Sequence, residues 1–365
     1  MKSLRGLAVL TLLLLAACTG PPEGIKVEPK PAPAPSPSPL DKLDAAEIPE
    51  ETRKLVGLSE LVAFVRGHNR AVSALAFSPD GKRLATSGWD NAVVLWDMTG
   101  AEPKEIAKLE GSPSGVAFIA DGKRLVTGGP DQRVIVWDIA GDKPKLRTKL
   151  GGHKASPFAI QATPNGLMLA SGSLNPRLRV WKFDVVEAET WAVIVGENAP
   201  ALGISSLSFS SDGKLLASGA HLGKPSLRIW DVSGGVMEER TLPAAQARLV
   251  QFSPKEPLLA FAADDPTIYL WSVAGNEPKS LHELNGDKAT KSTPAIKALA
   301  FTPDGKVLAS GGVDRLLIFW NVAKGEEIRT LPLLDEVRAL AFAPDGRHLA
   351  VGNDDGTISI LRLKW

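Results

Sequence analysis

The chain has 365 residues, of which 44% are hydrophobic and 23% are charged, and its formal net charge is +1. This composition is typical of a folded globular protein. It excludes an overall positive field that would attract nucleic acid, so we expect no nucleic-acid partner. The single cysteine excludes an internal disulfide, so the fold must be stabilised by its core.

The chain begins with a segment typical of exported proteins. Residues 6–17 form an uncharged, mostly apolar run after a basic start. The run is too short to cross a bilayer, which takes ~20 residues, but it has the length of the apolar part of a secretory signal. Its end, Leu15-Ala16-Ala17-Cys18, resembles the lipobox of bacterial lipoproteins. The resemblance implies that residues 1–17 are removed as a signal peptide and that Cys18 is lipidated.

The same resemblance implies a location. Lipid chains on Cys18 would anchor the protein to a membrane. In that family an aspartate after the cysteine retains many lipoproteins at the inner membrane; Thr19 stands there instead, which favours the outer membrane if the organism has one. The alternative is a soluble export signal in which the cysteine is incidental.

Residues 18–57 are expected to form a disordered tether. Residues 21–39 contain 8 prolines. Proline fixes φ and removes backbone donors, so this stretch favours extended polyproline II, roughly 60 Å long. We interpret it as a stiff spacer, with a ligand for an SH3-type domain as the alternative. Residues 40–57 are charged and could hold a short helix.

From residue 58 onward, one unit recurs seven times. Five copies share an aromatic residue, a pair of residues and Asp-Gly, between short alternating apolar runs, and two weaker copies are Ala162-Thr163-Pro164-Asn165-Gly166 and Phe252-Ser253-Pro254-Lys255-Glu256. This pattern is typical of a β-hairpin turn. The clearest copies are Phe77-Ser78-Pro79-Asp80-Gly81, Phe118-Ile119-Ala120-Asp121-Gly122, Phe209-Ser210-Ser211-Asp212-Gly213, Phe301-Thr302-Pro303-Asp304-Gly305 and Phe342-Ala343-Pro344-Asp345-Gly346.

A second anchor follows each aromatic residue after about 19 positions, and it accounts for six of the 9 tryptophans. Successive anchors are 41 to 49 residues apart. Such a period, with several short strands in each copy, predicts the blades of a β-propeller. The anchors are Trp96, Trp137, Trp181, Trp230, Trp271 and Trp320, with Leu361 in the last copy.

These repeats strongly resemble the WD40 family over residues 58–365. The resemblance implies an all-β, seven-bladed β-propeller, which we expect to be monomeric. The complete structural tetrad of the family is matched once, by His68, Thr86, Asp90 and Trp96. Such a buried network stiffens a blade when every member is satisfied. Most copies lack the histidine, so their blades are expected to rely more on packing.

The ends of the repeat region predict how the ring closes. The last copy ends after its third strand, at residues 358–363. Residues 60–66 align with the fourth strands of the next two copies. We therefore expect this N-terminal segment to complete blade seven, which would remove an open sheet edge.

No sequence pattern indicates catalysis or metal binding. The five histidines are scattered, no pair has metal-ligand spacing, and no nucleophile elbow is present. The glycine-rich stretch 219–226 lacks the spacing of a phosphate loop. We therefore expect no enzyme activity, no cofactor and no metal.

The remaining candidate is an interaction surface. In WD40 proteins, one face of the ring commonly binds partners. The position four residues before each aromatic anchor should lie there, and it is basic in copies five to seven, as Arg248, Lys297 and Arg338. We predict an arc that could hold an acidic peptide or a phosphorylated or carboxylate group. Trp89 is predicted to be an exposed hot spot beside it. The alternatives are solvated charges and a tryptophan packed against a loop.

These patterns favour a membrane-anchored scaffold in the periplasm or at the cell surface that binds a partner protein on one face of the propeller. One alternative is an exported propeller enzyme, lactonase-like or of the quinoprotein type. The other is an envelope-assembly factor. Because one fold hosts many functions, the sequence does not identify the partner protein.

Overall fold

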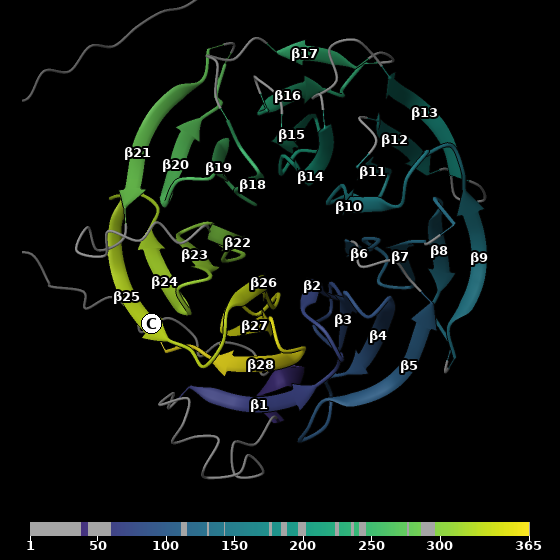
Figure 1. Cartoon of the computed structure of the whole chain (residues 1–365), viewed down its shortest axis with the longest axis vertical. Helices are drawn as coiled ribbons and strands as arrows, with labels where there is room; N and C mark the ends of the chain where they lie inside the picture. Colours follow the sequence, from purple (N-terminus) through teal and green to yellow (C-terminus); the bar gives the residue numbers. More distant parts are fainter. Residues whose placement is uncertain are drawn as a thin grey trace, which may run out of the picture. The chain divides into compact units, whose positions relative to one another are not determined.

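The computed structural model describes residues 38–42, 60–110, 115–129, 131–141, 143–174, 177–183, 188–195, 202–222, 226–234, 237–240, 246–275, 277–285 and 296–364. Cys18, the expected lipid site, lies outside these residues. So does Ser114, which stands four residues before Phe118 in the second copy. Seven four-stranded antiparallel sheets stand around a central axis, with strands β2, β6, β10, β14, β18, β22 and β26 facing it (Figure 1). The predicted all-β, seven-bladed propeller is therefore confirmed.

The strands follow the repeat closely, with the bounds that follow. Blade one contains β2 (Val72–Phe77), β3 (Arg83–Gly88), β4 (Ala92–Asp97) and β5 (Lys104–Glu110); blade two contains β6 (Val116–Phe118), β7 (Arg124–Gly128), β8 (Val134–Asp138) and β9 (Lys145–Leu150); blade three contains β10 (Pro157–Ala162), β11 (Met168–Ser173), β12 (Arg177–Phe183) and β13 (Ala188–Val195); blade four contains β14 (Leu202–Phe209), β15 (Leu215–Leu222), β16 (Arg228–Asp231) and β17 (Glu238–Arg240).

The remaining three blades complete the ring. Blade five contains β18 (Leu249–Phe252), β19 (Leu258–Ala262), β20 (Thr267–Ser272) and β21 (Lys279–Asn285); blade six contains β22 (Ile296–Phe301), β23 (Val307–Gly312), β24 (Leu316–Asn321) and β25 (Glu326–Pro332); blade seven contains β26 (Val337–Phe342), β27 (His348–Asn353), β28 (Thr357–Arg362) and β1 (Leu61–Arg66).

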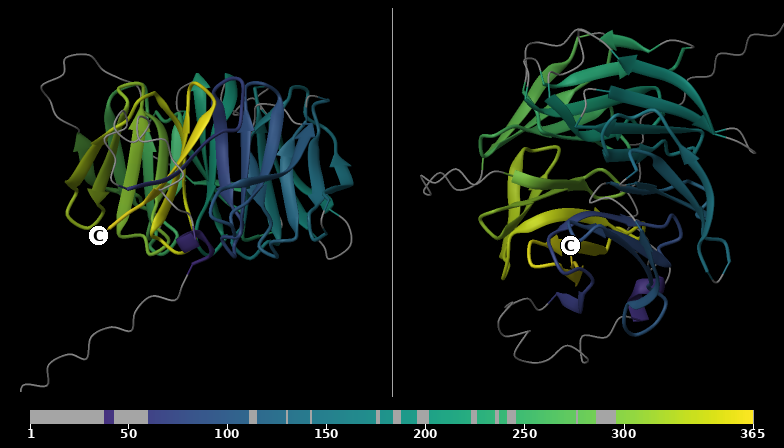
Figure 2. Two further views of the ribbon diagram at one scale, coloured as in Figure 1. Left: turned by 90° about the horizontal axis from the view of Figure 1, so that it is seen from below. Right: turned by 45° about the vertical axis from the view of Figure 1, so that its right-hand side comes forward.

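Two faces of the ring are distinguished below. The top face carries the turns between second and third strands and the connections from one blade to the next. The bottom face carries the turns between first and second strands and between third and fourth strands (Figure 2).

The repeated Asp-Gly forms the turn between first and second strands. In blade one, Ser78 Oγ and the Lys82 N–H donate to Asp80 Oδ1 at 2.6 and 3.0 Å. Burial opposes ionisation of Asp80, but these hydrogen bonds outweigh it and lower the pKa of the carboxyl. Gly81 has a φ of 69°, a left-handed conformation that glycine adopts without strain.

The tryptophan column is fixed by a repeated hydrogen bond. In five blades the indole Nε1 donates to a serine or threonine hydroxyl on the second strand, at 2.8 to 3.1 Å. A buried indole N–H needs such an acceptor. The five pairs are Trp96–Thr86, Trp137–Thr127, Trp181–Ser171, Trp230–Ser218 and Trp320–Ser310.

Blade five replaces this bond with aromatic packing. Phe261 stands on β19 where five other blades have the hydroxyl, and its ring lies 5.1 Å from Trp271 in an edge-on arrangement. Tyr269 stacks on Phe261 with centroids 5.2 Å apart. These ring contacts stabilise the pair by about 0.5–1.5 kcal/mol each beyond burial.

Blade seven is closed by the N-terminal strand, as predicted. β1 pairs antiparallel with β28, with Leu61 opposite Leu361, Ala63 opposite Ile360 and Val65 opposite Ile358. β1 is the outermost strand of this blade (Figure 1). The first and last strands of the ring therefore hold each other in place.

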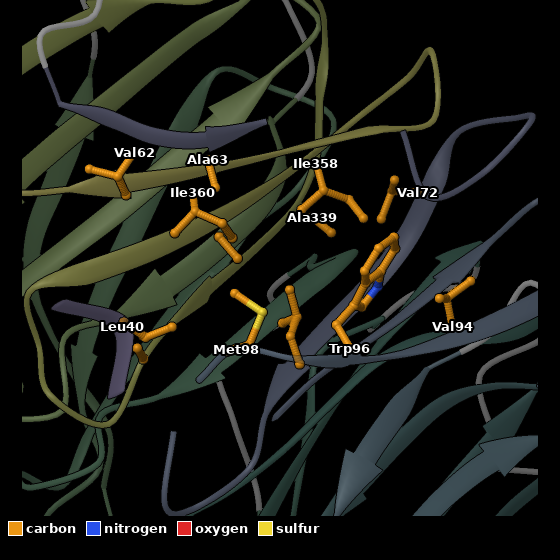
Figure 3. Packing of buried hydrophobic residues seen from close by; sticks show 13 residues of the cluster. Leu40, Val62, Ala63, Val72, Val94, Trp96, Met98, Ala339, Ile358 and Ile360 are labelled. Carbon is orange, nitrogen blue, oxygen red and sulfur yellow. The ribbon is translucent and has the colours of Figure 1, made fainter. Parts of the chain in front are cut away.

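The expected tether, residues 18–57, lies mostly outside the described residues, but a short part of it is placed. Pro39–Lys42 form a 3-10 helix, η1, on the bottom face (Figure 2). Leu40 is fully buried in a cluster with Met98 and Trp96 of blade one and Ile360 of blade seven (Figure 3). The compact unit that holds the propeller therefore begins at Ser38 rather than at residue 58, where we expected it to begin.

Deletion of residues 58–66 tests the closure. The deletion exposes the edge of β28 and removes the buried side chains of Leu61 and Val62. Their loss alone corresponds to about 3–6 kcal/mol. We expect the free energy of unfolding in urea to fall by at least that much. Deletion of residues 22–30, which is equally long, serves as the control; equal stability of the two deletions would contradict the closure.

Candidate interaction site at the channel mouth

The inner strands of five blades carry a β-bulge at the same position. In each, the register with the second strand shifts by one residue near the top face. A bulge bends its strand and re-aims the extra side chain. The extra residues are Ser73, Phe158, Ser205, Lys297 and Arg338. These residues occupy the position four before the anchor of each copy. The bulge therefore changes the direction of the side chain at this position in five blades.

The structure brings the three predicted basic residues close together. Burial is the main cause that lowers the pKa of Lys297, and the positive charges of Arg248 and Arg338 lower it further. Arg248 directly precedes β18, and its N–H donates to Ala262 O at 2.8 Å. Three adjacent blades therefore present their charges to one region of the channel mouth, the opening of the central channel on the top face.

Carboxylates that the sequence analysis missed hold the two arginines. Arg248 Nη1 lies 2.6 Å from Asp264 Oδ1. Arg338 lies between two partners, with Nε 2.7 Å from Asp354 Oδ1 and Nη2 3.0 Å from Glu336 Oε2. Asp354 occupies the turn position that Trp89 holds in blade one, and this equivalence was a signal for its place at the mouth.

Lys297 differs from both arginines. Within the described part of the chain, its ammonium has neither a hydrogen bond nor an ion pair. Its side chain is partly exposed. Glu336 and Asp264 act against burial and against the two arginines, but the pKa of Lys297 is still lowered, so an anion placed next to its ammonium would be favoured.

Trp89 is exposed, but it turns toward a different neighbour from the one expected. Its side chain is 47% accessible, and its ring centroid lies 6.1 Å from that of Phe158, at a tilt of 41°. Phe158 is the bulge residue of blade three, so the ring leans across blade two instead of toward blade seven. The mouth thus carries an aromatic pair on blades one and three, and three basic side chains with the carboxylates that pair with the two arginines on blades five to seven.

The predicted tetrad of blade one is joined by hydrogen bonds. Trp96 Nε1 donates to Thr86 Oγ1 at 3.1 Å, and Thr86 Oγ1 lies 2.8 Å from His68 Nε2. His68 Nδ1 lies 3.0 Å from Asp90 Oδ1. Because the carboxylate only accepts, Nδ1 carries the proton and Thr86 donates to Nε2. Burial lowers the pKa of His68 in spite of Asp90, so the ring is neutral at pH 7.

Below the mouth, the inner strands enclose a cavity of about 340 Å³. Its lining residues include Phe77, Phe301 and Phe342, with Gln161 and Gln251 as its polar side chains, and most of the lining surface open to the cavity is polar. A second hollow of about 370 Å³ lies over Tyr269 and Trp271 of blade five. Neither lining contains a histidine, cysteine or serine, and the titratable side chains of the second are Asp264, Asp265 and Tyr269.

No group of three or more histidine, cysteine, aspartate or glutamate side chains among the described residues is arranged to hold a metal ion. In the described part of the chain, no helix has the length and apolar character needed to span a membrane.

A family comparison agrees with this geometry. The profile described as "WD domain, G-beta repeat" matches residues 59–97, 103–138, 144–182, 194–231, 278–321 and 325–361, more than half of the chain. The chain belongs to the WD40 family. Propellers of this family typically act as scaffolds for protein interactions. The unmatched stretch contains most of blade five, where Phe261 replaces the usual hydroxyl.

Curated relatives share the repeats rather than a common length. Small ribosomal subunit protein RACK1 of Schizosaccharomyces pombe is 31% identical over 262 residues, which cover 71% of this chain and 81% of that protein. Transducin beta-like protein 3 of Rattus norvegicus is 28% identical over 184 residues, 49% of this chain. Periodic tryptophan protein 2 homolog of S. pombe is 25% identical over 189 residues, 48% of this chain. The match spans only 21% of each of the latter two proteins.

His68→Gln tests the tetrad. The folded protein lowers the pKa of His68 from its ordinary 6.5, so the unfolded chain binds the proton more tightly. The contribution of His68 to stability is therefore complete above about pH 6.5 and falls below it, by at most about 1.4 kcal/mol per pH unit. Urea unfolding at about pH 7.5 and 5.5 should show a smaller pH dependence in His68→Gln than in the wild type. An identical dependence would contradict the network.

Proposed function

We propose that this WD40 protein is a docking platform that holds a partner protein at the mouth of its channel. The observation that carries the proposal is the Lys297 ammonium, which has no ion pair within the described residues and lies beside two arginines that carboxylates already hold. An acidic side chain of a partner would supply the missing counter-ion. The exposed ring of Trp89, supported by Phe158, would supply an apolar anchor.

The two halves of the mouth suggest what the partner presents. The cationic half favours a carboxylate or a phosphorylated group, and the aromatic half favours an apolar side chain nearby. Arg248 and Arg338 are oriented by Asp264 and Asp354, so they lose little conformational freedom when a partner binds. We therefore propose an acidic peptide segment as the recognised element.

We further propose that the platform is exported and anchored to a membrane through a lipid on Cys18. The support is the sequence alone: a basic start, a short apolar run and Leu15-Ala16-Ala17-Cys18. Lipid chains on this residue would hold the propeller at a membrane surface. The prolines that follow would act as a spacer.

A crosslinked pull-down from membranes of the native host tests the docking site. The variant combines Trp89→Ala, Arg248→Glu, Lys297→Glu and Arg338→Glu. A protein recovered with the wild type is expected to be lost with this variant, because charge reversal repels an acidic segment. The matched control places Leu167→Ala, Lys123→Glu, Lys214→Glu and Lys255→Glu on the bottom face. Lys297→Gln alone is expected to weaken recovery without altering the melting temperature. Equal recovery with the top-face and bottom-face variants would contradict the proposal.

Labelling with an alkyne analogue of palmitate tests the anchor. The wild type is expected to incorporate the label and to sediment with membranes. Cys18→Ser is expected to lose the label and to leave the membrane fraction, because it removes the thiol that carries the lipid. A control substitution, Thr19→Ser, should retain both properties. Equal labelling of Cys18→Ser would contradict a lipid on this residue.

A further inference from the structure

The bottom face contains a small groove at the seam between blades seven and one, and the protein fills this groove with its own chain. Leu40 is fully buried there, in one cluster with Met98 and Trp96 of blade one and Ile360 of blade seven (Figure 3). Ala343 of blade seven belongs to the same cluster. A leucine side chain buried to this extent is stabilised by leaving water. The groove therefore has the character of an apolar pocket that selects one side chain.

Polar groups of blade seven fix the residues around that leucine. Asp41 Oδ2 lies 3.1 Å from Arg347 Nη2. Arg362 Nη2 donates to the backbone carbonyls of Leu40, at 3.3 Å, and Asp41, at 3.2 Å. One apolar pocket, one pairing for a carboxylate and one donor for two peptide carbonyls are the elements with which proteins recognise short peptides.

Arg362 is itself held by a buried histidine. His348 is fully buried on β27, and its Nδ1 lies 2.7 Å from Asp345 Oδ2. Arg362 Nε donates to His348 Nε2 at 3.1 Å, so this nitrogen must be an acceptor and the imidazole is neutral. The residue that holds the peptide carbonyls thus depends on an unprotonated nitrogen.

The charged groups around His348 determine what a second proton would do. Asp345 and Asp41 favour a positive ring, whereas Arg347 and Arg362 oppose it. Burial raises the pKa of Asp345, but hydrogen bonds from His348, Ser38 and the Arg347 backbone outweigh this and hold the pKa far below its usual range. Asp345 therefore stays ionised, and a proton added to the pair resides on Nε2. There it faces the Arg362 Nε–H, so this hydrogen bond is lost and two cations are brought together.

We propose that this seam is a binding site for a leucine–aspartate peptide, that residues 38–42 occupy it as an intramolecular ligand, and that it holds its peptide only while His348 is neutral. The site is independent of the channel mouth, which opens on the other face. A proton on His348 Nε2 would break the hydrogen bond from Arg362 Nε and so release the segment. The vacated groove is then open to a segment of the same chemistry from another chain.

Peptide binding to a vacated protein tests the proposal. The full chain carrying Leu40→Asp and Asp41→Lys, called the vacated protein below, loses the buried side chain of Leu40 and the carboxylate that pairs with Arg347. The probe is a fluorescein-labelled peptide with the sequence of residues 36–44, SPSPLDKLD, and the control peptide has aspartate in place of the leucine that corresponds to Leu40. Fluorescence anisotropy is expected to show binding of the probe to the vacated protein at pH 8 and about tenfold weaker binding at pH 5, the loss of one charged hydrogen bond.

A histidine variant isolates the proton. His348→Gln retains one donor for Asp345 and one acceptor for Arg362 but does not titrate. In the vacated protein it is expected to bind the probe equally at pH 8 and pH 5. The wild type is expected to bind the probe only weakly at pH 8, because its own segment competes at an effective concentration in the mM range.

Two outcomes would overturn the proposal. If the folded vacated protein binds probe and control peptide equally, the seam is not a peptide site. If the pH dependence is absent, or persists in His348→Gln, the histidine does not control it. If the vacated protein does not fold, hydrogen exchange of the Asp41 amide, which is bonded to Ser38 O, decides in the intact chain. Its protection should fall at pH 5 in the wild type and not in His348→Gln.

Discussion

The pairing of β1 with β28 is the constraint on which the rest of the structure depends. The last blade reaches four strands only because β1 pairs with β28, so residues from the two ends of the repeat region complete it. The core behind this pairing joins blade seven to blade one through Ile358, Ile360 and Trp96. Because the ring is closed, every inner strand has a fixed place around the axis. The bulge residues of separate blades can therefore meet at one mouth.

The blades keep this framework with different chemistry. Five use a hydroxyl to accept the indole N–H of the tryptophan column, and one adds a histidine and an aspartate to that bond. Blade five uses Phe261 and Tyr269 instead, which leaves a hollow over Trp271. A hydrogen bond fixes direction and an aromatic cluster fills volume. Each tryptophan of the column has to be fixed in its blade, and either a hydroxyl acceptor or an aromatic neighbour is sufficient for this.

Much of this fold follows from the sequence because the repeat reports it seven times. The Asp-Gly turns, the tryptophan spacing and the unfinished last copy predicted seven blades and their closure. The candidate site was predictable only in part. The repeat spacing put Arg248, Lys297 and Arg338 at equivalent positions of three blades. It did not predict the β-bulge that changes the direction of the Lys297 and Arg338 side chains. Asp264 and Asp354 come from turns, and their contact with arginines depends on how neighbouring blades pack. Nothing in the polar, proline-rich surroundings of Leu40 indicated that it would be buried.

The position of η1 also determines how the protein responds to force. Ser38–Lys42 precede β1 in the chain, so a pull on the N-terminal side reaches the contacts of Leu40 and Asp41 before it reaches the β1–β28 ladder. Those contacts are one buried side chain, one ion pair and two hydrogen bonds to carbonyls. They yield at lower load than a strand paired along its length. We therefore expect the contacts of η1 to break before the β1–β28 pairing does, which would leave the propeller closed under a pull on its N-terminal side.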